Sequence, residues 1–183
     1  MPGYAYAILA FGWLGWIAPF LLALRRPRSN PQQVDHRARW GILFLVVAYS
    51  LIWQAHFWTR TLPPWRLAFS VLFLLIANAL SWSSARSLGR QWRIEAGLNP
   101  DHELVVSGPY RIVRHPIYAS MLCIFCATAF VVTPLPLFLV ALLFFIVGTE
   151  IRVRVEDGLL AGRFGEQFTT YKNTVPAYIP FVR

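Results

Sequence analysis

The sequence predicts an all-α, polytopic membrane protein with five transmembrane helices. Of the 183 residues, 57% are hydrophobic and 14% are charged, whereas a soluble domain carries about 45–50% apolar and about 25% charged residues. The apolar residues also gather in five nearly uncharged stretches, residues 4–24, 40–58, 67–82, 117–132 and 135–151. We expect one domain over residues 1–183, with three helices in residues 1–82 and two in residues 83–183.

The five stretches are justified by length and by what flanks them. A bilayer crossing takes roughly 17–25 apolar residues, and residues 4–24 and 40–58 are long enough by themselves. The three later stretches are shorter, but flanking Trp, Pro or Arg residues at the membrane interface extend them. The last two stretches are separated by a very short link around Pro134, which predicts a tight antiparallel hairpin.

The basic residues predict the orientation of the helices. Fifteen of the 17 lie in residues 25–39, 83–116 and 152–183, and the alternating segments hold only Arg60 and Arg66. Because loops rich in Arg and Lys stay in the cytoplasm, we expect the N-terminus outside and the C-terminus in the cytoplasm. The membrane topology and contact with anionic lipid head groups then explain the net charge of +9. We therefore expect no nucleic-acid partner.

Polar residues inside the apolar stretches are interpreted as structural. Gln54 and Asn78 are expected to form interhelical hydrogen bonds, and His56 to reach the membrane interface. Cys123 and Cys126 form a C-x-x-C pair, which in a soluble protein suggests redox or metal chemistry. Here the pair lies in an apolar stretch with no second pair, so we expect small packing residues. No metal site is predicted.

Two charged stretches are expected to meet at the cytoplasmic membrane surface. Residues 107–120 read SGPYRIVRHPIYAS, in which Gly108-Pro109 predicts a turn and Pro116 a helix start. Helix N-termini favour anionic groups, although Arg, Tyr and His residues here could simply anchor the chain at lipid head groups. The hairpin returns residues 150–157 to the same depth.

The returning stretch carries Arg152, Glu156 and Asp157. The simplest interpretation is an ion pair between Arg152 and Glu156, four residues apart on one helix face. The alternative is a ligand site, in which Glu156 and Asp157 hold a cationic or hydroxyl-rich ligand and Arg152 faces an anionic group.

Three motifs resemble the isoprenylcysteine carboxyl methyltransferase family, in its short prokaryotic five-helix form. They are HELVVSGPYRIVRHPIY, the pattern R-x-x-x-E-D-x-x-L-x-x-x-F-G and the ending YKNTVPAYIPF. The resemblance as a whole covers roughly residues 80–183. Members of that family are integral membrane enzymes that use S-adenosylmethionine. The resemblance therefore implies a cytoplasmic cofactor pocket formed by residues 83–116 and the C-terminal tail.

The resemblance also implies roles for individual residues. Arg152 matches the arginine at the substrate end and is the predicted catalytic residue. The implied cofactor-binding residues are Glu95 (placed by ungapped counting), His102, Glu103, Leu104, Val105, Tyr110, His115, Pro116, Ile117, Tyr118 and Glu156. The chain departs from the family where Asp157 replaces a second Glu, Ser120 a Gly, and Arg154-Val155 part of a longer acidic run. The shorter Asp157 reaches less far, which leaves its role open.

The expected function is S-adenosylmethionine-dependent carboxyl O-methylation of an isoprenoid-like or other lipidic acceptor. One alternative is a phosphatidylethanolamine-type phospholipid N-methyltransferase, which shares the RHPxY and paired-acid motifs. A second is a non-catalytic membrane scaffold, and a nicotinamide-dependent, sterol-reductase-like enzyme ranks last. The expected partners are membrane lipids and the lipidic acceptor, and the expected location is the bacterial inner membrane.

Overall fold

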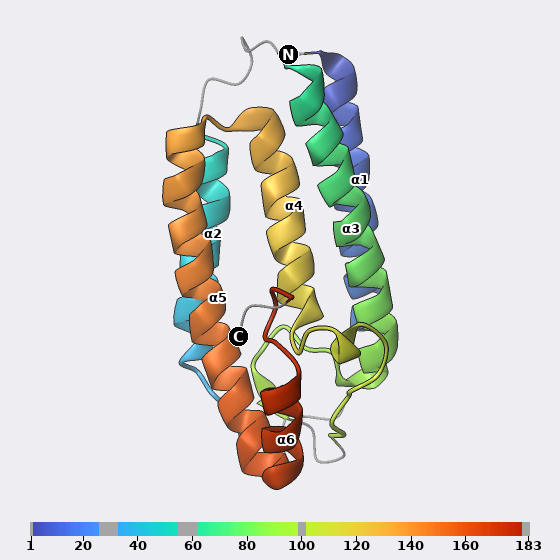
Figure 1. The fold of residues 1–183 in the computed structure, drawn as a ribbon, viewed down its shortest axis with the longest axis vertical. Helices are drawn as coiled ribbons and strands as arrows, with labels where there is room; N and C mark the ends of the chain where they lie inside the picture. The colour runs from blue at the N-terminus through green and yellow to red at the C-terminus, as the bar shows by residue number, and fades with distance from the viewer. Residues whose placement is uncertain (1, 26–32, 55–61, 99–101, 181–183) are drawn as a thin grey trace.

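Five long helices and one short one make up most of the computed structural model (Figure 1). The structure describes residues 2–25, 33–54, 62–98 and 102–180. The helices are α1 (Gly3–Leu24), α2 (Ala38–Ile52), α3 (Pro64–Leu88), α4 (Pro116–Val132), α5 (Leu135–Phe164) and α6 (Glu166–Thr174). Short 3-10 helices η2 (Gly89–Gln91) and η3 (Gly108–Arg111), and strands β1 (Gln33–Val34) and β2 (Gly97–Leu98), lie in the connections. The helical class predicted from composition is confirmed.

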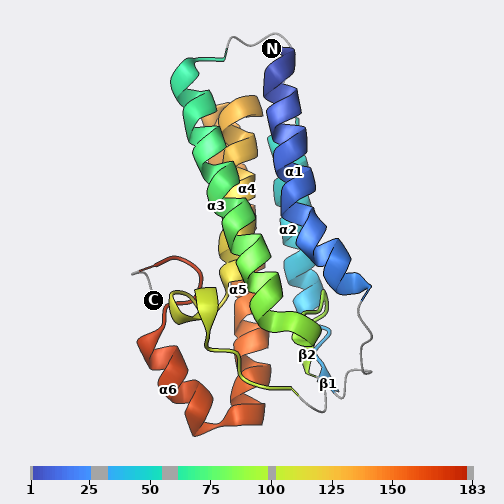
Figure 2. The ribbon, with the colours of Figure 1, turned by 90° about the vertical axis from the view of Figure 1, so that its right-hand side faces the viewer.

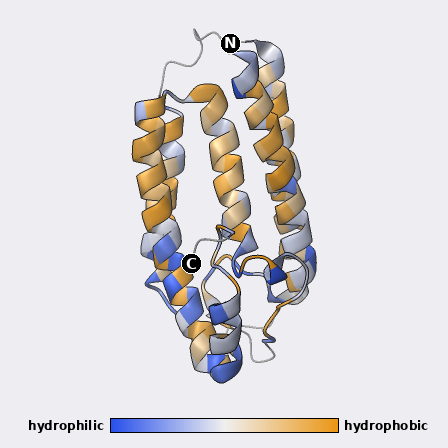
Figure 3. Ribbon diagram, viewed as in Figure 1, coloured by the Kyte–Doolittle hydropathy of each residue, from blue (hydrophilic) through white to orange (hydrophobic). Residues whose placement is uncertain are grey.

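Among the described residues, three helices, α1, α3 and α5, are long and apolar enough to cross a membrane. The apolar helices α2 and α4 are shorter, with 15 and 17 residues. Helix α2 ends at Ile52, before the predicted end at residue 58, and residues 55–61 lie outside the described part of the chain. Apolar residues dominate one end of the bundle, and polar residues gather at the other, around the end of α5 and α6 (Figure 3). We call this second region the polar end.

Helix α4 lies between two helix pairs, α1 with α3 on one side and α2 with α5 on the other (Figure 1). Helices α4 and α5 run antiparallel, as their short link predicts, but each packs mainly on another helix, α4 on α3 and α5 on α2. Aromatic side chains bridge the two, since the ring centroids of Phe125 and Phe145 are 5.0 Å apart. The hairpin thus spreads its helices over two layers of the bundle.

Two glycines allow α2 and α5 to approach closely. A Cβ atom added to Gly41 would lie 2.6 Å from the carbonyl oxygen of Gly148 and 2.5 Å from Cγ of Arg152. Small residues at such a contact let helix backbones pack tightly, as is common within membranes. The contact also sets the position of Arg152, so the α2–α5 packing and the predicted catalytic residue depend on the same glycine.

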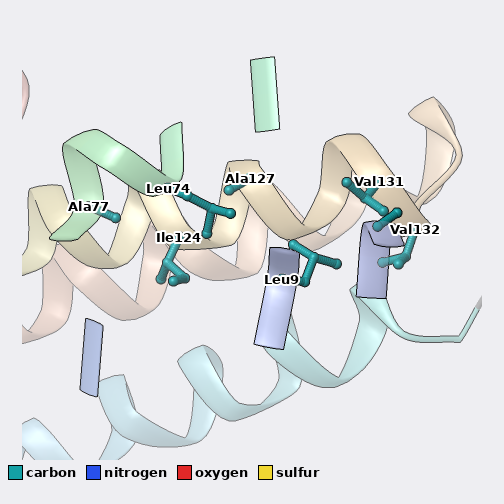
Figure 4. Close-up of a cluster of buried hydrophobic side chains, with 8 residues drawn as sticks. Leu9, Leu74, Ala77, Ile124, Ala127, Val131 and Val132 are labelled. Atoms are coloured by element: carbon teal, nitrogen blue, oxygen red, sulfur yellow. The ribbon is translucent and has the colours of Figure 1, made fainter. Parts of the chain in front are cut away.

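The apolar core joins α1, α3 and α4 through small and branched side chains (Figure 4). Its buried members are Ala5 and Leu9 of α1, Leu74 and Ala77 of α3, and Ile124, Ala127, Val131 and Val132 of α4. Cys123 packs against this core, and Cys126 packs against the cluster shared by α2, α4 and α5. Both are free thiols, in agreement with the packing role predicted for them.

Hydrogen bonds between helices supplement the apolar core. The Asn78 amide donates to the carbonyl of Gly12 at 3.2 Å, which confirms its predicted structural role. The Gln54 amide, just beyond the end of α2, instead donates back to the Ser50 carbonyl in the last turn of that helix. His56 lies outside the described residues.

At the polar end, β1 and β2 pair antiparallel, with Gln33 opposite Leu98 (Figure 2). This two-stranded sheet was not expected from the sequence. It fixes the backbone just before α2 to the backbone that follows η2. The segment that follows η2 lines the cavity described below.

Candidate functional site

A turn and a proline set the start of α4. Gly108 opens η3 with a φ of 61°, a conformation that glycine adopts readily and other residues do not. His115 lies outside the helical region, with φ −125° and ψ 64°, immediately before Pro116, which is the first residue of α4. The predicted turn and helix start are both present, and they place His115 at the N-terminal end of α4.

The C-terminal segment braces this helix start. The backbone N–H groups of Arg114 and His115 donate to the carbonyls of Pro176 and Ala177, each at 2.8 Å. The Tyr171 hydroxyl on α6 donates to the carbonyl of Tyr110 at 2.6 Å. Burial raises the pKa of Tyr171 to about 12, so this donor keeps its proton at physiological pH. Segments more than sixty residues apart in sequence thus form one unit.

Arg152, on the inner face of α5, is held in one orientation by three acceptors. Its Nε donates to the Tyr118 hydroxyl at 2.6 Å, and its Nη2 donates to the Ile94 carbonyl at 2.8 Å and to Oε1 of Glu156 at 3.2 Å. The Tyr118 hydroxyl donates in turn to the same Glu156 oxygen. The simple intrahelical ion pair is therefore present, but a tyrosine from α4 completes it.

His115 lies between the two adjacent acids of α5. Its Nδ1 is 3.4 Å from Oε2 of Glu156, and its Nε2 is 2.9 Å from Oδ1 of Asp157. Burial lowers the pKa of His115, but the hydrogen bonds to Asp157 and Glu156 outweigh it, so the pKa lies above its usual value. With a carboxylate beside each nitrogen, the doubly protonated ring is favoured.

Asp157 is buried among cations rather than exposed to a ligand. Arg114 Nη2 and Lys172 Nζ both lie 3.2 Å from its Oδ2. Arg114 also donates to the carbonyls of Val175 and of Lys172, the latter at 3.0 Å. Asp157 does not line the cavity described below, and a role for it in holding a ligand together with Glu156 stays a prediction. Arg114 is a buried tie to the C-terminal segment.

A cavity of about 910 Å³ opens beside this cluster. That volume is near the upper end of the range typical of small-molecule sites. Its polar wall comes from the segments around η2, β2 and η3 and from the facing ends of α4 and α5. Its apolar wall runs up between α1 and α2, where Trp13, Trp16, Tyr49 and Trp53 line it. One continuous space therefore has a charged end and an aromatic end.

Most of the residues predicted for the site line this cavity. They are Glu95, His102, Glu103, Leu104, Val105, Tyr110, His115, Ile117, Tyr118, Arg152 and Glu156. Pro116 is buried and starts α4, but it is not in the wall. The structure thus brings together residues that are spread over some sixty positions of the sequence, while their binding and catalytic roles remain predictions.

Several wall residues carry no sequence motif that would have revealed them. The side-chain oxygen of Gln91 is buried and has no hydrogen-bond partner among the described residues. The Ile94 carbonyl and the aromatic side chains of α1 and α2 were likewise not predicted. Their place in the cavity wall distinguishes these residues from ordinary helix-packing residues, and that place is known only once the fold is known.

The wall suits a small ligand that carries charges of both signs. Arg93, Arg114 and Arg152 line it together with Glu95, Glu103 and Glu156. S-adenosylmethionine, the cofactor that the sequence resemblance implies, has a sulfonium and an ammonium group, a carboxylate, and amino and hydroxyl donors for an acceptor such as Gln91 Oε1. The donors and acceptors present therefore fit that cofactor. Within the described ranges, no group of three His, Cys, Asp or Glu side chains is arranged to hold a metal ion.

Comparison with known proteins assigns the family. The sequence profile described as phospholipid methyltransferase matches residues 65–167, more than half of the chain. The chain belongs to this family. The matched region begins in α3 and ends in α6, and it contains Arg152, Glu156 and the whole of α4.

Three curated relatives of this phospholipid methyltransferase family member extend the comparison. It is 29% identical to the cobalt-zinc-cadmium resistance protein CzcN of Cupriavidus metallidurans, over 77% of this chain and 62% of that protein. It is 27% identical to protein-S-isoprenylcysteine O-methyltransferase B of Arabidopsis thaliana, over 64% and 61%. It is 30% identical to protein-S-isoprenylcysteine O-methyltransferase of Schizosaccharomyces pombe, over 60% and 48%.

The last two relatives confirm the resemblance to isoprenylcysteine methyltransferases inferred from the motifs. The aligned regions span about half to three fifths of the length of these relatives. Family membership and three long apolar helices together identify an integral membrane protein.

Proposed function

We propose that this protein is a membrane methyltransferase that uses S-adenosylmethionine to methylate a carboxylate on an isoprenoid-like or other lipidic acceptor. The observation that carries the proposal is the position of Arg152. Its guanidinium is fixed by Tyr118, Glu156 and the Ile94 carbonyl, in the wall of a cavity that joins a charged end to an apolar groove. Such a cavity suits a soluble cofactor at one end and a lipid chain at the other.

The chain's own residues have separate tasks in this proposal. When bound, S-adenosylmethionine supplies an electrophilic methyl group that a carboxylate oxygen accepts by direct displacement, with no proton transfer. The described hydrogen bonds of Arg152 use Nε and Nη2, and its Nη1 is the donor that we propose for the acceptor carboxylate. Glu156, whose side chain is 25% exposed, would accept hydrogen bonds from the cofactor. Positioning then supplies most of the rate.

The proposed topology follows the charge distribution. All five long helices would cross the bacterial inner membrane, with the N-terminus outside and the C-terminus in the cytoplasm. Fifteen of 17 basic residues lie in segments on one side, and Figure 3 shows polar residues gathered at the end where α6 lies. Helices α2 and α4 would need flanking interfacial residues to complete their crossings. The cofactor would reach the cavity from the cytoplasm.

A phospholipid N-methyltransferase is the second candidate, because the matching profile carries the name phospholipid methyltransferase. An amine acceptor must lose a proton before or during the transfer, so it needs a base. An arginine fixed at the cavity wall suits a carboxylate better than an amine. A non-catalytic scaffold is the third candidate, and it requires neither cofactor binding nor transfer.

Two measurements test the proposal with purified protein in lipid nanodiscs. Calorimetric titration with S-adenosylmethionine should show binding, and a folded preparation without binding would exclude both transferase candidates. Incubation with methyl-labelled cofactor, a prenylthio carboxylic acid and phosphatidylethanolamine should then label the acid. Mild base releases methanol from a methyl ester but not from an N-methyl amine, so base-stable label in the phospholipid would favour the second candidate.

A further inference from the structure

The aromatic end of the cavity stops at two tryptophans that also line a second hollow. The larger cavity is lined along α1 from Leu24 to Trp13, and along α2 to Trp53, the residue that follows the helix. A separate cavity of about 500 Å³ lies beyond, lined by Tyr6, Leu9, Ala10, Trp13 and Trp53. Trp13 and Trp53 are the two residues common to both walls. They therefore stand as a partition between two parts of one groove along α1 and α2.

A hydrogen bond and two ring contacts hold Trp13 in place. Its indole Nε1 donates to Oγ1 of Thr128 on α4 at 3.0 Å. Its ring meets Trp16 edge-on at 5.5 Å and Tyr49 edge-on at 5.7 Å between centroids. Tyr49 is fixed in turn, because its hydroxyl donates to the Met121 carbonyl at 2.9 Å. A side chain held on three sides is a wall rather than a mobile contact.

We propose that Trp13 sets the longest apolar chain that the cavity accepts. This inference rests on the proposed function, since it concerns the tail of the lipidic acceptor. With the acceptor's polar group at Arg152, its tail would run along α1 towards Trp13. The part of α1 from Leu24 to Trp13 is about 16 Å long, and the part from Trp13 to Tyr6 adds about 10 Å. Removing the partition would open that second length to a longer chain.

The occupant follows from the continuity of the cavity. The same space that holds Arg152 and Glu156 at one end holds Trp16, Leu45 and Val46 along its course. A ligand that satisfies both ends has a polar head and an apolar tail. Helix α1 packs on α3 while α2 packs on α5, so the tail would lie between the two helix pairs.

The test measures binding of a graded series of tails in the absence of methyl donor. The probes are geranyl-, farnesyl-, geranylgeranyl- and geranylfarnesyl-thioacetic acid, in competition with radiolabelled farnesylthioacetic acid on protein in nanodiscs. The tail length that binds best should be longer in Trp13→Ala than in the wild type. Affinity should rise about fourfold for each methylene group that becomes buried. Trp13→Phe keeps a ring in place and should keep the wild-type optimum.

Controls separate the partition from general effects. Phe11→Ala removes an aromatic ring from the same helix at a side chain that is 75% exposed, so it should leave the series unchanged. Trp13→Leu opens the wall with a smaller loss of packing and serves if the alanine variant does not fold. In the Trp13→Ala background, Ala10→Phe should fill the outer cavity and restore the shorter optimum.

The outcomes distinguish this inference from the proposed function. If Trp13→Ala and Trp13→Leu both fold and keep the wild-type optimum of tail length, the role of Trp13 is overturned, even if the wild type transfers methyl groups. A shifted optimum in a protein that transfers no methyl group supports the partition and counts against the transferase. An optimum that shifts equally in Phe11→Ala also overturns the partition, because the effect would then come from the lipid-facing surface.

Discussion

Two arginine–carboxylate pairs lie side by side on α5 and its neighbours, and they differ in what surrounds them. Arg152 and Glu156 face the cavity, and a quarter of the Glu156 side chain is exposed. The side chains of Arg114 and Asp157 are only 3% and 4% exposed, and the Asp157 carboxylate is not part of the cavity wall. Both pairs have a closest N–O distance of 3.2 Å. The N–O distance therefore does not distinguish the two pairs, whereas the exposure of their carboxylates to the cavity does.

Adjacent positions on a helix point in different directions, which explains how one acidic dipeptide serves two environments. Glu156 points to Arg152 and Tyr118, whereas Asp157 points to Arg114 and Lys172. His115 touches both acids and links the two pairs. The first pair is thus available for ligands, and the second ties the C-terminal segment to the start of α4.

The largest effect is expected from Asp157→Asn. It leaves the buried Arg114 guanidinium without its carboxylate, and breaking a buried pair in this way costs about 3–5 kcal/mol. Thermal unfolding in detergent should show the loss, and limited proteolysis should show earlier cleavage after α5. Asp35→Asn is the matched control, because Asp35 pairs with Arg37 at 2.6 Å but the Arg37 side chain is 82% exposed. Equal shifts in the two variants would contradict the comparison.

The next effect is expected on activity, from Arg152→Lys. The substitution keeps the charge but loses the planar fork that contacts Tyr118, Glu156 and the Ile94 carbonyl. We expect kcat to fall on the order of 10²–10³-fold, as when one preorganised donor is removed from an active site. Cofactor affinity, measured by calorimetry, should change much less.

Arg154→Lys is the control for this prediction. Arg154 lies two residues away on the same helix, pairs with Glu150 at 3.5 Å, and is 71% exposed. It should keep wild-type activity. If the two lysine variants lose activity equally, Arg152 has no special role at the cavity wall.

The sequence predicts the region of the site but not which of its two adjacent acids faces the cavity. The motifs around His115 and Arg152 were sufficient to bring both to one surface, because the short link at Pro134 leaves the chain no other path. The motifs could not show that Glu156 and Asp157 point in different directions. The surroundings of each acid depend on where Arg114 and Lys172 lie, which only the fold shows. The aromatic groove was missed because Trp and Tyr in an apolar helix look like lipid-facing residues until the opposing helix is placed.

The pH dependence of stability tests the link between the pairs. The pKa of His115 is raised in the folded protein, so its stabilising contribution is fully present below the unfolded pKa of about 6.5 and is lost as the pH rises through the folded pKa. The unfolding temperature should therefore fall over this range, in which the neighbouring carboxylates stay ionised. His115→Asn should remove that part of the dependence and leave whatever the other three histidines contribute. An identical pH profile in the variant would show that His115 does not link the two pairs.

The smallest expected effect on stability tests whether burial or distance decides how strongly a cation stabilises the Asp157 carboxylate. Lys172 Nζ and Arg114 Nη2 both lie 3.2 Å from the same Asp157 oxygen, but the Lys172 side chain is 44% exposed. Water therefore screens the Lys172 contact, and Lys172→Met should cost less than about 1 kcal/mol. Arg114→Met leaves Asp157 buried with only this partly exposed cation and His115, so it should cost several times more. Equal losses of stability on thermal unfolding of the two variants would mean that the distance to Asp157 matters more than burial. Burial would then no longer explain how the Arg152–Glu156 and Arg114–Asp157 pairs differ.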